Sequence, residues 1–127
     1  MPGCRSRYVI DGSNLLGSWG GPQPGSDRRR EVVARVGQFC ETHAVDATLV
    51  FDGRPFEPVP AQPRLRLLFP VPGGDADTVI RALVDGASRP ALLRVVTSDK
   101  ALYSYARTRG AAIMRAHEWN AAARSLP

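Results

Sequence analysis

Five short apolar segments along the chain lack the alternation of apolar and polar residues that marks a strand with one face in water. They are Arg7–Asp11, Ala47–Asp52, Leu65–Phe69, Leu92–Thr97 and Ala111–Arg115. Segments of this kind are typical of strands covered on both faces, as in a parallel sheet that lies between layers of helices. The feature therefore predicts an α/β fold with a mainly parallel, five-stranded sheet.

Helical patterns lie between most of these segments. Apolar residues recur with a period near 3.6 over residues 28–43, 76–85 and 99–109, and residues 117–124 are expected to form a short last helix. The expected order is β-α-β-β-α-β-α-β-α, with right-handed crossovers and three layers in an α/β/α sandwich. A proline-rich extended loop joins the second and third strands, and residues 17–25, rich in glycine and proline, are expected to form another loop.

Length and composition fit a single domain over residues 1–127. Of the 127 residues, 43% are hydrophobic, enough for a core without disulfide bonds or zinc. Cys4 and Cys40 are expected to be reduced thiols, because two cysteines without paired spacing make neither a disulfide framework nor a zinc site. No apolar run approaches the roughly 20 residues of a membrane helix, and no signal peptide is read at the N-terminus. We therefore expect a cytoplasmic protein without a membrane partner.

The charge balance favours a polyanionic partner. The chain carries 17 basic and 12 acidic residues, a formal net charge of +5, and every basic residue except Lys100 is an arginine. Arginine suits phosphate recognition because its planar guanidinium offers a fork of donors. Simple solubility is the alternative explanation, and the charge alone does not separate the two.

Four aspartates fall where the predicted strands end or helices begin. Asp11 and Asp52 end the first and second strands, Asp99 follows the fourth, and Asp77 lies in the first turn of the helix before the fourth strand. Ligands of open α/β sheets bind at the carboxyl ends of the strands, so we expect these acids to share one rim. Oxygen-only ligands suit Mg²⁺ or Mn²⁺ rather than zinc.

Ordinary structural roles account for most of these acids and their neighbours. Asp75 and Ser98 are expected to cap the helices that follow them. Asp77 and Asp99 in first turns would favour their helix dipoles by roughly 0.3–1 kcal/mol each. Asp52 precedes a glycine and could form a turn.

Asp11 is the acid without such an explanation. It ends an apolar strand, so its carboxylate is expected to be partly buried. A buried carboxylate needs a cation or hydrogen-bond donors.

Four motifs, in order along the chain, are similar to those of one nuclease family. They are Tyr8–Leu16 (YVIDGSNLL), Val50–Gly53 (VFDG), Ala76–Ile80 (ADTVI) and Val95–Asp99 (VVTSD). Together they resemble the NYN domains, which are PIN-like ribonucleases, and most closely the bacterial YacP-like branch. The resemblance spans about residues 7–115 and implies the PIN-like strand order 3-2-1-4-5, with the first strand in the centre.

The same resemblance implies a metal-dependent endoribonuclease that uses Mg²⁺ or Mn²⁺. Asp11, Asp77 and Asp99 would form its acidic, metal-binding core. Asn14 would reach the same catalytic site, with Ser13 and Ser98 in supporting positions.

The chain departs from the family pattern at places where many members carry one more acid. Those places hold Thr78, Leu102 and Tyr103. Asp52 or Asp75 could substitute for the missing acid. Otherwise the site would hold one metal rather than two, or would catalyse slowly.

Basic residues lie close to these acids in the sequence and are candidates for gripping RNA phosphates. They are Arg28, Arg29, Arg30, Arg54, Arg81 and Lys100. Trp19 is a candidate for stacking on a base of a single-stranded substrate. The alternatives are a solvated helix start for the arginine triplet and packing against its own domain for Trp19.

The expected partner is therefore RNA, in single-stranded form. Ribosome association and homodimer formation are left open by the sequence. The alternative function is a PIN-like domain that binds RNA but cuts it weakly or not at all, because one acid of the pattern is missing. Receiver, adhesion and haloacid dehalogenase-type domains fit less well, because Gly12, Ser13 and Leu15 stand where those domains need other residues.

Overall fold

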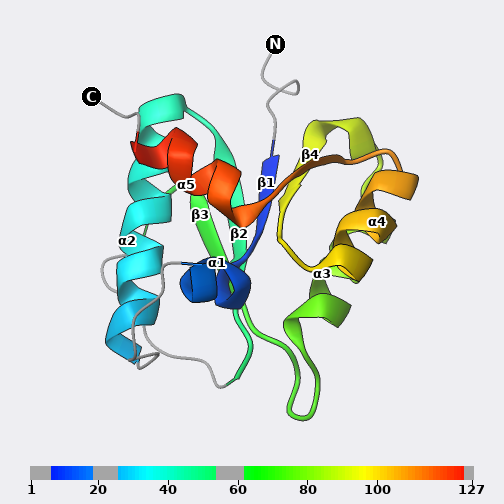
Figure 1. Ribbon diagram of the computed structural model, residues 1–127, viewed down its shortest axis with the longest axis horizontal. Helices are drawn as coiled ribbons and strands as arrows, with labels where there is room; N and C mark the ends of the chain where they lie inside the picture. Colours follow the sequence, from blue (N-terminus) through cyan, green and yellow to red (C-terminus); the bar gives the residue numbers. More distant parts are fainter. Residues whose placement is uncertain (1–6, 19–25, 54–61, 125–127) are drawn as a thin grey trace.

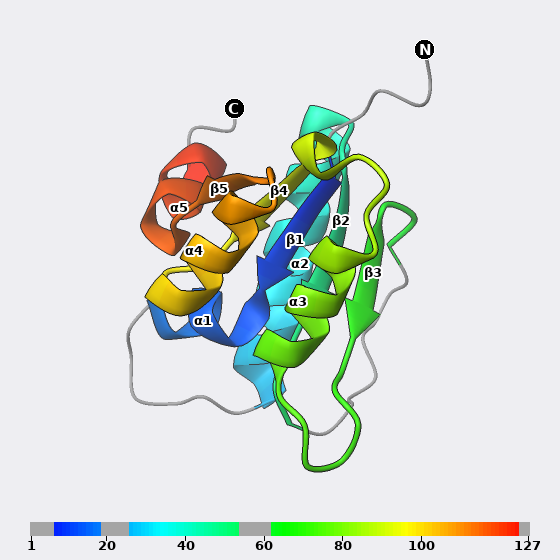
Figure 2. The same cartoon turned by 90° about the vertical axis from the view of Figure 1, so that its right-hand side faces the viewer.

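The computed structural model describes residues 7–18, 26–53 and 62–124, and these residues form a sheet with helices on both faces (Figures 1 and 2). The strands are β1 (Arg7–Asp11), β2 (Asp46–Val50), β3 (Leu65–Leu68), β4 (Leu93–Val96) and β5 (Ala112–Met114). In the described residues the order is β3-β2-β1-β4-β5, and every pairing is parallel. The expected fold, order and central first strand are confirmed.

The helices divide between the two faces of the sheet. On one face lie α1 (Gly12–Ser18), α2 (Ser26–His43) and α5 (Ala116–Arg124), and on the other lie α3 (Ala76–Asp85) and α4 (Lys100–Thr108) (Figure 1). A short 3₁₀ turn, η2 (Pro90–Leu92), leads into β4. Within the described ranges no helix combines the length and the apolar character needed to cross a membrane.

Each face of the sheet has its own buried cluster, which explains why the strands do not alternate. In β1, Ile10 packs with α2 and α5, whereas Val9 packs with α3 and α4. Trp119 of α5 is fully buried in the first cluster, and its ring lies 5.2 Å from that of Phe39. Ile80 is fully buried in the second cluster. Both faces of a strand in such a sheet must be apolar, because neither meets water.

Helix α1 was not expected from the sequence. Gly12 and Gly17 lower the intrinsic helix propensity of this segment by roughly 1 kcal/mol each relative to alanine. Tertiary packing overrides that preference, because Leu15 is fully buried and the backbone of Gly12 lies against the ring of Phe51. A Cβ added at Gly12 would come within 2.7 Å of that ring. The close approach sets the start of α1 against the chain that leaves β2.

β1 has the predicted bounds, whereas β2, β3, β4 and β5 end earlier than the apolar segments that predict them. Asp52, Phe69, Thr97 and Arg115 follow their strands rather than ending them. Parts of the ladder continue, since the backbone N–H of Thr97 donates to the carbonyl of Met114 at 3.0 Å. Asp52 and Thr97, just after β2 and β4, form side-chain hydrogen bonds with other segments at the carboxyl ends of the strands.

Candidate functional site

Three helices begin at the carboxyl ends of β1, β2 and β4, and side-chain hydrogen bonds tie their first turns together. Helix α1 follows β1 directly, and α4 follows β4 after a short turn. Helix α3 is linked to the end of β2 through Asp52. The Oδ1 of Asp52 accepts from the backbone N–H of Ala76, the first residue of α3, at 2.7 Å. The sheet topology thus brings residues 11–14, 52, 76–77 and 97–99 to one rim, as the sequence predicts.

Asp11 lies at the centre of this rim. Its Oδ1 accepts from the backbone N–H of Asn14 at 3.2 Å, and its Oδ2 accepts from the hydroxyl of Thr97 at 3.2 Å. The first bond reaches the third residue of α1, which is the geometry of an N-terminal cap. The expectation that Asp11 has no cap role is therefore wrong. The expectation that a half-buried Asp11 needs donors is met by these two groups.

Burial raises the pKa of Asp11 to about 6. The hydrogen bonds from Asn14 and Thr97 oppose this rise, whereas the negative charges of Asp52 and Asp99 add to it. A carboxyl that is half-buried beside two other carboxylates favours the neutral form unless a cation arrives. The three acids thus act on one another, although they come from distant parts of the sequence.

Thr97 is a site residue that the sequence reasoning did not identify. It is completely buried, and its hydroxyl donates to Asp11 while accepting from the backbone N–H of Asp99 at 3.1 Å. It therefore connects the acid at the end of β1 to the acid before α4. A buried polar residue at the end of an otherwise apolar strand is the signal that could have indicated it.

Asn14 and Ser98 connect α1, β4 and α5. The amide Oδ1 of Asn14 accepts from the backbone N–H of Ser98 at 2.8 Å. The hydroxyl of Ser98 accepts from the backbone N–H of Ala116, the first residue of α5, at 3.1 Å. Both residues lie at the rim as expected.

The expected cap of α4 is wrong, because Asp99 rather than Ser98 caps that helix. Asp99 Oδ1 accepts from the backbone N–H groups of Ala101 and Leu102 at 2.9 and 3.1 Å. The chain takes its turn one residue later than expected, which leaves Ser98 free to bind α5 instead. Asp99 remains exposed.

Ser13 and Asp52 join the start of α1 to the chain after β2. The hydroxyl of Ser13 accepts from the backbone N–H of Asp52 at 2.9 Å. Gly53, the next residue, has φ +87°, a left-handed conformation that suits glycine and turns the chain away. Asp52 therefore forms a turn and also anchors the first residue of α3.

Asp77 lies in the first turn of α3 and pairs with Arg81 one turn later. The Nε of Arg81 donates to Asp77 Oδ2 at 2.9 Å. The other oxygen, Oδ1, is buried and has no hydrogen-bond partner within the described residues. Burying an anionic oxygen without a partner is costly, so this atom is suited to a cation.

Asp75 caps α3, as expected. Its Oδ1 accepts from the backbone N–H and the hydroxyl of Thr78 at 2.9 and 2.7 Å. These bonds, the hydroxyl bond first, hold the pKa of Asp75 below its ordinary value. The cap role explains Asp75 without a metal.

A family comparison identifies this arrangement. The family model described as the YacP-like NYN domain matches residues 8–125. The chain belongs to this family. The matched range contains every element from β1 to α5 except the first residue of β1. The family is one of nuclease-like domains, which supports an RNase-type function and RNA as a partner.

Solved structures share the fold of this NYN domain. The crystal structure of the W164L mutant of Rae1 (YacP) from Bacillus subtilis matches with a TM-score of 0.79 and 19% identity, over 94% of this chain and 76% of that one. The crystal structure of Rae1 (YacP) from Bacillus subtilis matches with a TM-score of 0.76 and 21% identity, over 94% and 74%. No curated protein matches by sequence.

The acids of this NYN domain do not form a ready-made metal cage. Among the residues that the structure describes, no group of three or more His, Cys, Asp and Glu side chains is placed to hold a metal ion. The donor set still has the chemistry of a hard cation site, because all of its candidates are carboxylate oxygens. The buried, unpartnered Oδ1 of Asp77 and the desolvated carboxyl of Asp11 are the atoms that fit such an ion.

The predicted RNA-binding cations occupy different positions. Lys100 is exposed as the first residue of α4, beside Asp99. Arg81 is held by Asp77, and its guanidinium also lies over the ring of Tyr105 at 4.5 Å. The triplet Arg28, Arg29 and Arg30 lies in the first turns of α2, which begins at the same end of the sheet as α1 (Figure 1). Arg54 and Trp19 lie outside the described residues.

Cys40, one of the two expected thiols, is a free cysteine in the core. Its side chain is fully buried in α2, and burial raises the pKa of the thiol to about 11. It is therefore a core residue rather than a nucleophile. Cys4 lies outside the described residues.

Proposed function

We propose that this NYN domain is a metal-dependent endoribonuclease that cleaves phosphodiester bonds of single-stranded RNA at its aspartate rim. Asp11, Asp77 and Asp99 would hold Mg²⁺ or Mn²⁺, and Asp52 is a further candidate ligand. The observation that carries the proposal is the half-buried Asp11, tied to Asn14 and Thr97 and repelled by two other carboxylates. This arrangement gains most from a bound cation, because like charges in one site disfavour ionisation.

A bound Mg²⁺ or Mn²⁺ supplies charge neutralisation at phosphate oxygens and a water of lowered pKa. The protein's own residues prepare the site. Thr97 and Asn14 hold the carboxyl of Asp11 in one orientation, and α4 fixes Oδ1 of the exposed Asp99. Arg81 fixes one oxygen of Asp77, and the other has no hydrogen-bond partner among the residues that the structure describes. Side chains fixed in this way lose little entropy when a ligand binds.

The helix N-termini at the rim stabilise the acids rather than the phosphodiester. The first turns of α1, α3 and α4 donate N–H groups to Asp11, Asp75 and Asp99, so positive charge for the phosphate must come from basic side chains. Lys100 and the arginine triplet of α2 supply positive charge for the RNA backbone, without reading its sequence.

The second candidate function is an RNA-binding domain of the same family that cuts slowly or not at all. The ion pair between Arg81 and Asp77 favours it, because a cation at Asp77 must share the carboxylate with a guanidinium.

A fluorogenic single-stranded RNA tests the two candidates. We expect the wild-type protein to cleave it with Mn²⁺ or Mg²⁺, and EDTA to stop cleavage. Asp11→Asn and Asp77→Asn should each lower the rate by about 100-fold, at or above the upper end of the loss caused by removing an outer-shell partner of a metal ligand. Glu41→Gln, which removes one exposed charge on α2, is the matched control and should cleave normally. RNA binding without cleavage in either metal would establish the second function and reject the first.

A further inference from the structure

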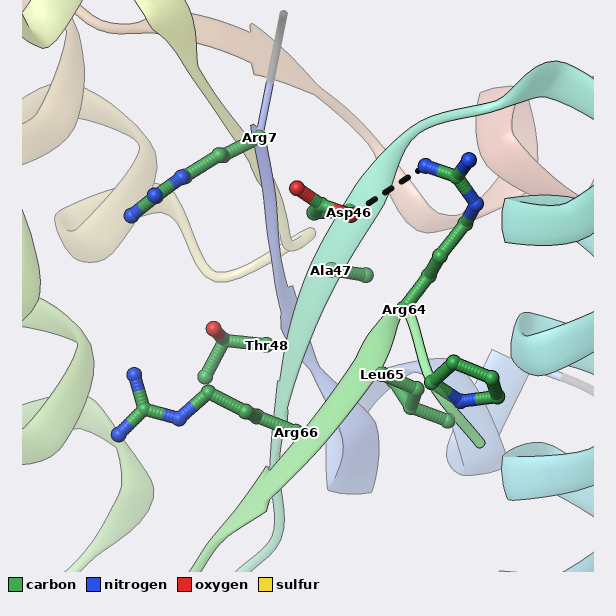
Figure 3. A pocket seen from close by; sticks show the side chains of 8 residues that line it. Arg7, Asp46, Ala47, Thr48, Arg64, Leu65 and Arg66 are labelled. Atoms are coloured by element: carbon green, nitrogen blue, oxygen red, sulfur yellow. Dashed lines mark ion pairs between the residues drawn. The ribbon is translucent and has the colours of Figure 1, made fainter. Parts of the chain in front are cut away.

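A cavity of about 240 Å³ lies at the opposite end of the sheet from the aspartate rim, around the first residues of β1, β2 and β3 (Figure 3). Arg7, Thr48 and Arg66 project into the same side of it from these three strands (Figure 3). The strand register explains this grouping, since Arg7 lies opposite Asp46 and Thr48 lies opposite Arg66. Asp46 and Thr48 share a face because they are two residues apart in β2. We name Arg7, Thr48 and Arg66 the arginine pocket.

The charge of the cavity is positive and only partly compensated. Asp46, the acid in its lining, pairs with Arg64 at 3.6 Å. Arg7 and Arg66 form no ion pair within the described residues, and both side chains are exposed. Two guanidinium groups on either side of a hydroxyl offer converging donors, which is the chemistry that binds a phosphate group.

The arginine pocket lies on the sheet face that carries α3 and α4. Val9 and Val50 follow Arg7 and Thr48 by two residues and therefore lie on the same face, and both pack into the buried cluster on that face. In Figure 2, β3 lies beside α3. Arg7 and Asp11 are four residues apart in β1 and therefore lie on the same face of the sheet, at its two ends.

The distance between pocket and rim corresponds to a short stretch of nucleic acid. Arg7 and Asp11 are four residues apart in one strand, which at about 3.3 Å per residue is about 13 Å. Nucleotides in a stacked strand advance about 3.4 Å each, so about four nucleotides cover it.

We propose that the arginine pocket binds a backbone phosphate of the RNA strand, about four nucleotides from the bond placed at Asp11. This inference rests on the proposed function for the position of the cleaved bond, but binding in the pocket does not need cleavage. The pocket would contribute affinity and a minimum substrate length rather than sequence preference, because phosphates carry no base information.

Binding measured in EDTA, where no metal-dependent cleavage occurs, tests the pocket. The variant Arg7→Gln/Arg66→Gln should bind a fluorescent RNA of about ten nucleotides about tenfold more weakly than wild type at moderate salt. The slope of log K against log salt should fall by about 0.7 for each lost phosphate contact. The matched control is Arg107→Gln/Arg124→Gln, which removes the same charge at exposed positions near the ends of α4 and α5. It should lower the affinity much less.

Two further arms separate a phosphate site from general charge. Thr48→Val keeps every charge and should still weaken binding of the long RNA. Inorganic phosphate should shift the amide resonances of residues 48 and 66 and compete with the long RNA.

Equal losses in the control and the double variant, or no loss in either, would overturn the inference. Phosphate binding in the pocket with unchanged RNA affinity of the double variant would reject RNA as the occupant. Circular dichroism of each variant establishes that it is folded. Cleavage by the wild-type protein is measured separately with metal. A protein that does not cleave RNA can therefore still show, or fail to show, binding in the arginine pocket.

Discussion

Thr97 shows how one hydroxyl can organise acids that repel each other. It donates to Asp11 and accepts from the backbone of Asp99, so both acids keep a fixed position without a cation. Its complete burial means that no water can take its place easily. At this scale the site depends on a residue that carries no charge.

Replacing that hydroxyl should cost stability in proportion to the bonds lost. Thr97→Val keeps the shape but leaves Asp11 Oδ2 and the Asp99 N–H without this partner, and we expect a loss of about 1–3 kcal/mol. Thr97→Ser keeps the hydroxyl and loses a buried methyl group, so its loss should be near 1 kcal/mol. Urea denaturation of both variants measures the difference. A serine variant less stable than the valine variant would contradict the bridging role.

The raised pKa of Asp11 predicts a pH dependence with a definite sign. Its folded pKa of about 6 lies above the unfolded value of 3.8, so the folded state binds the proton more tightly. The resulting stabilisation is fully present below pH 4 and is lost as the pH rises to about 6. Over that window the metal-free protein should lose up to about 3 kcal/mol through this group.

The variant Asp11→Asn removes this dependence and checks its source. It should be relatively less stable than wild type near pH 4 and equally or more stable near pH 7.5, in metal-free buffer. Denaturation midpoints at both pH values give the comparison. If the wild type is more stable than the variant by the same amount at both pH values, the pH dependence belongs to other groups.

Helix α1 illustrates how packing decides the structure of a short element. Its two glycines occupy opposite environments, since Gly12 is buried against Phe51 and Leu49, whereas nothing lies within 4 Å of a Cβ added at Gly17. The first glycine permits the helix to approach the end of β2. The second is exposed and only weakens the helix.

These environments predict opposite effects of the same substitution. Gly12→Ala forces a contact of 2.7 Å with a buried ring and should destabilise the protein by about 1–3 kcal/mol. Gly17→Ala should stabilise it by up to about 1 kcal/mol, because alanine restricts the unfolded chain and favours the helix. Thermal unfolding of the pair provides the measurement. Equal shifts in the two variants would refute the tight contact at Gly12.

The elements that the sequence predicted best are those whose burial leaves a clear apolar pattern. The strands around Val9 and Val95 are buried on both faces and show a continuous apolar run, whereas the helix around Ile80 is buried on one face and shows a period near 3.6. Helix α1 was missed because only Leu15 of its seven residues has a large, fully buried side chain. Its formation depends on Phe51, which the local sequence does not reveal.

The candidate site was predictable as a set of positions but not as a set of bonds. The topology alone brings Asp11, Asp52 and Asp99 to one rim. Which residue caps α4 depends on where the chain turns after β4, a difference of one residue that pattern reasoning could not resolve. The ion pair that holds Asp77 was visible as an i, i+4 spacing.

At the scale of the whole molecule, a metal ion should act as a stabilising ligand. If the proposed site is right, Mn²⁺ at about 100 times its dissociation constant should stabilise the folded protein by about 2.7 kcal/mol. Asp11→Asn should lose most of this gain, and Glu41→Gln should keep it. Thermal unfolding with and without Mn²⁺ measures both. An equal Mn²⁺ shift in the Asp11 variant would place the metal elsewhere.

The central place of β1 also fixes when the molecule becomes complete. β1 precedes the other strands in the sequence, yet one of its two neighbours, β4, lies more than 80 residues further along, and the bond between Asp11 and Thr97 spans 86 residues. Contacts so distant in the sequence form late and make folding slow, because a long loop must close first. A nascent chain that ends before β4 contains Asp11 but neither Thr97 nor Asp99, so the contacts that hold the carboxyl of Asp11 to β4 cannot form. The arrangement of the rim is therefore completed only after β4 has been added to the sheet.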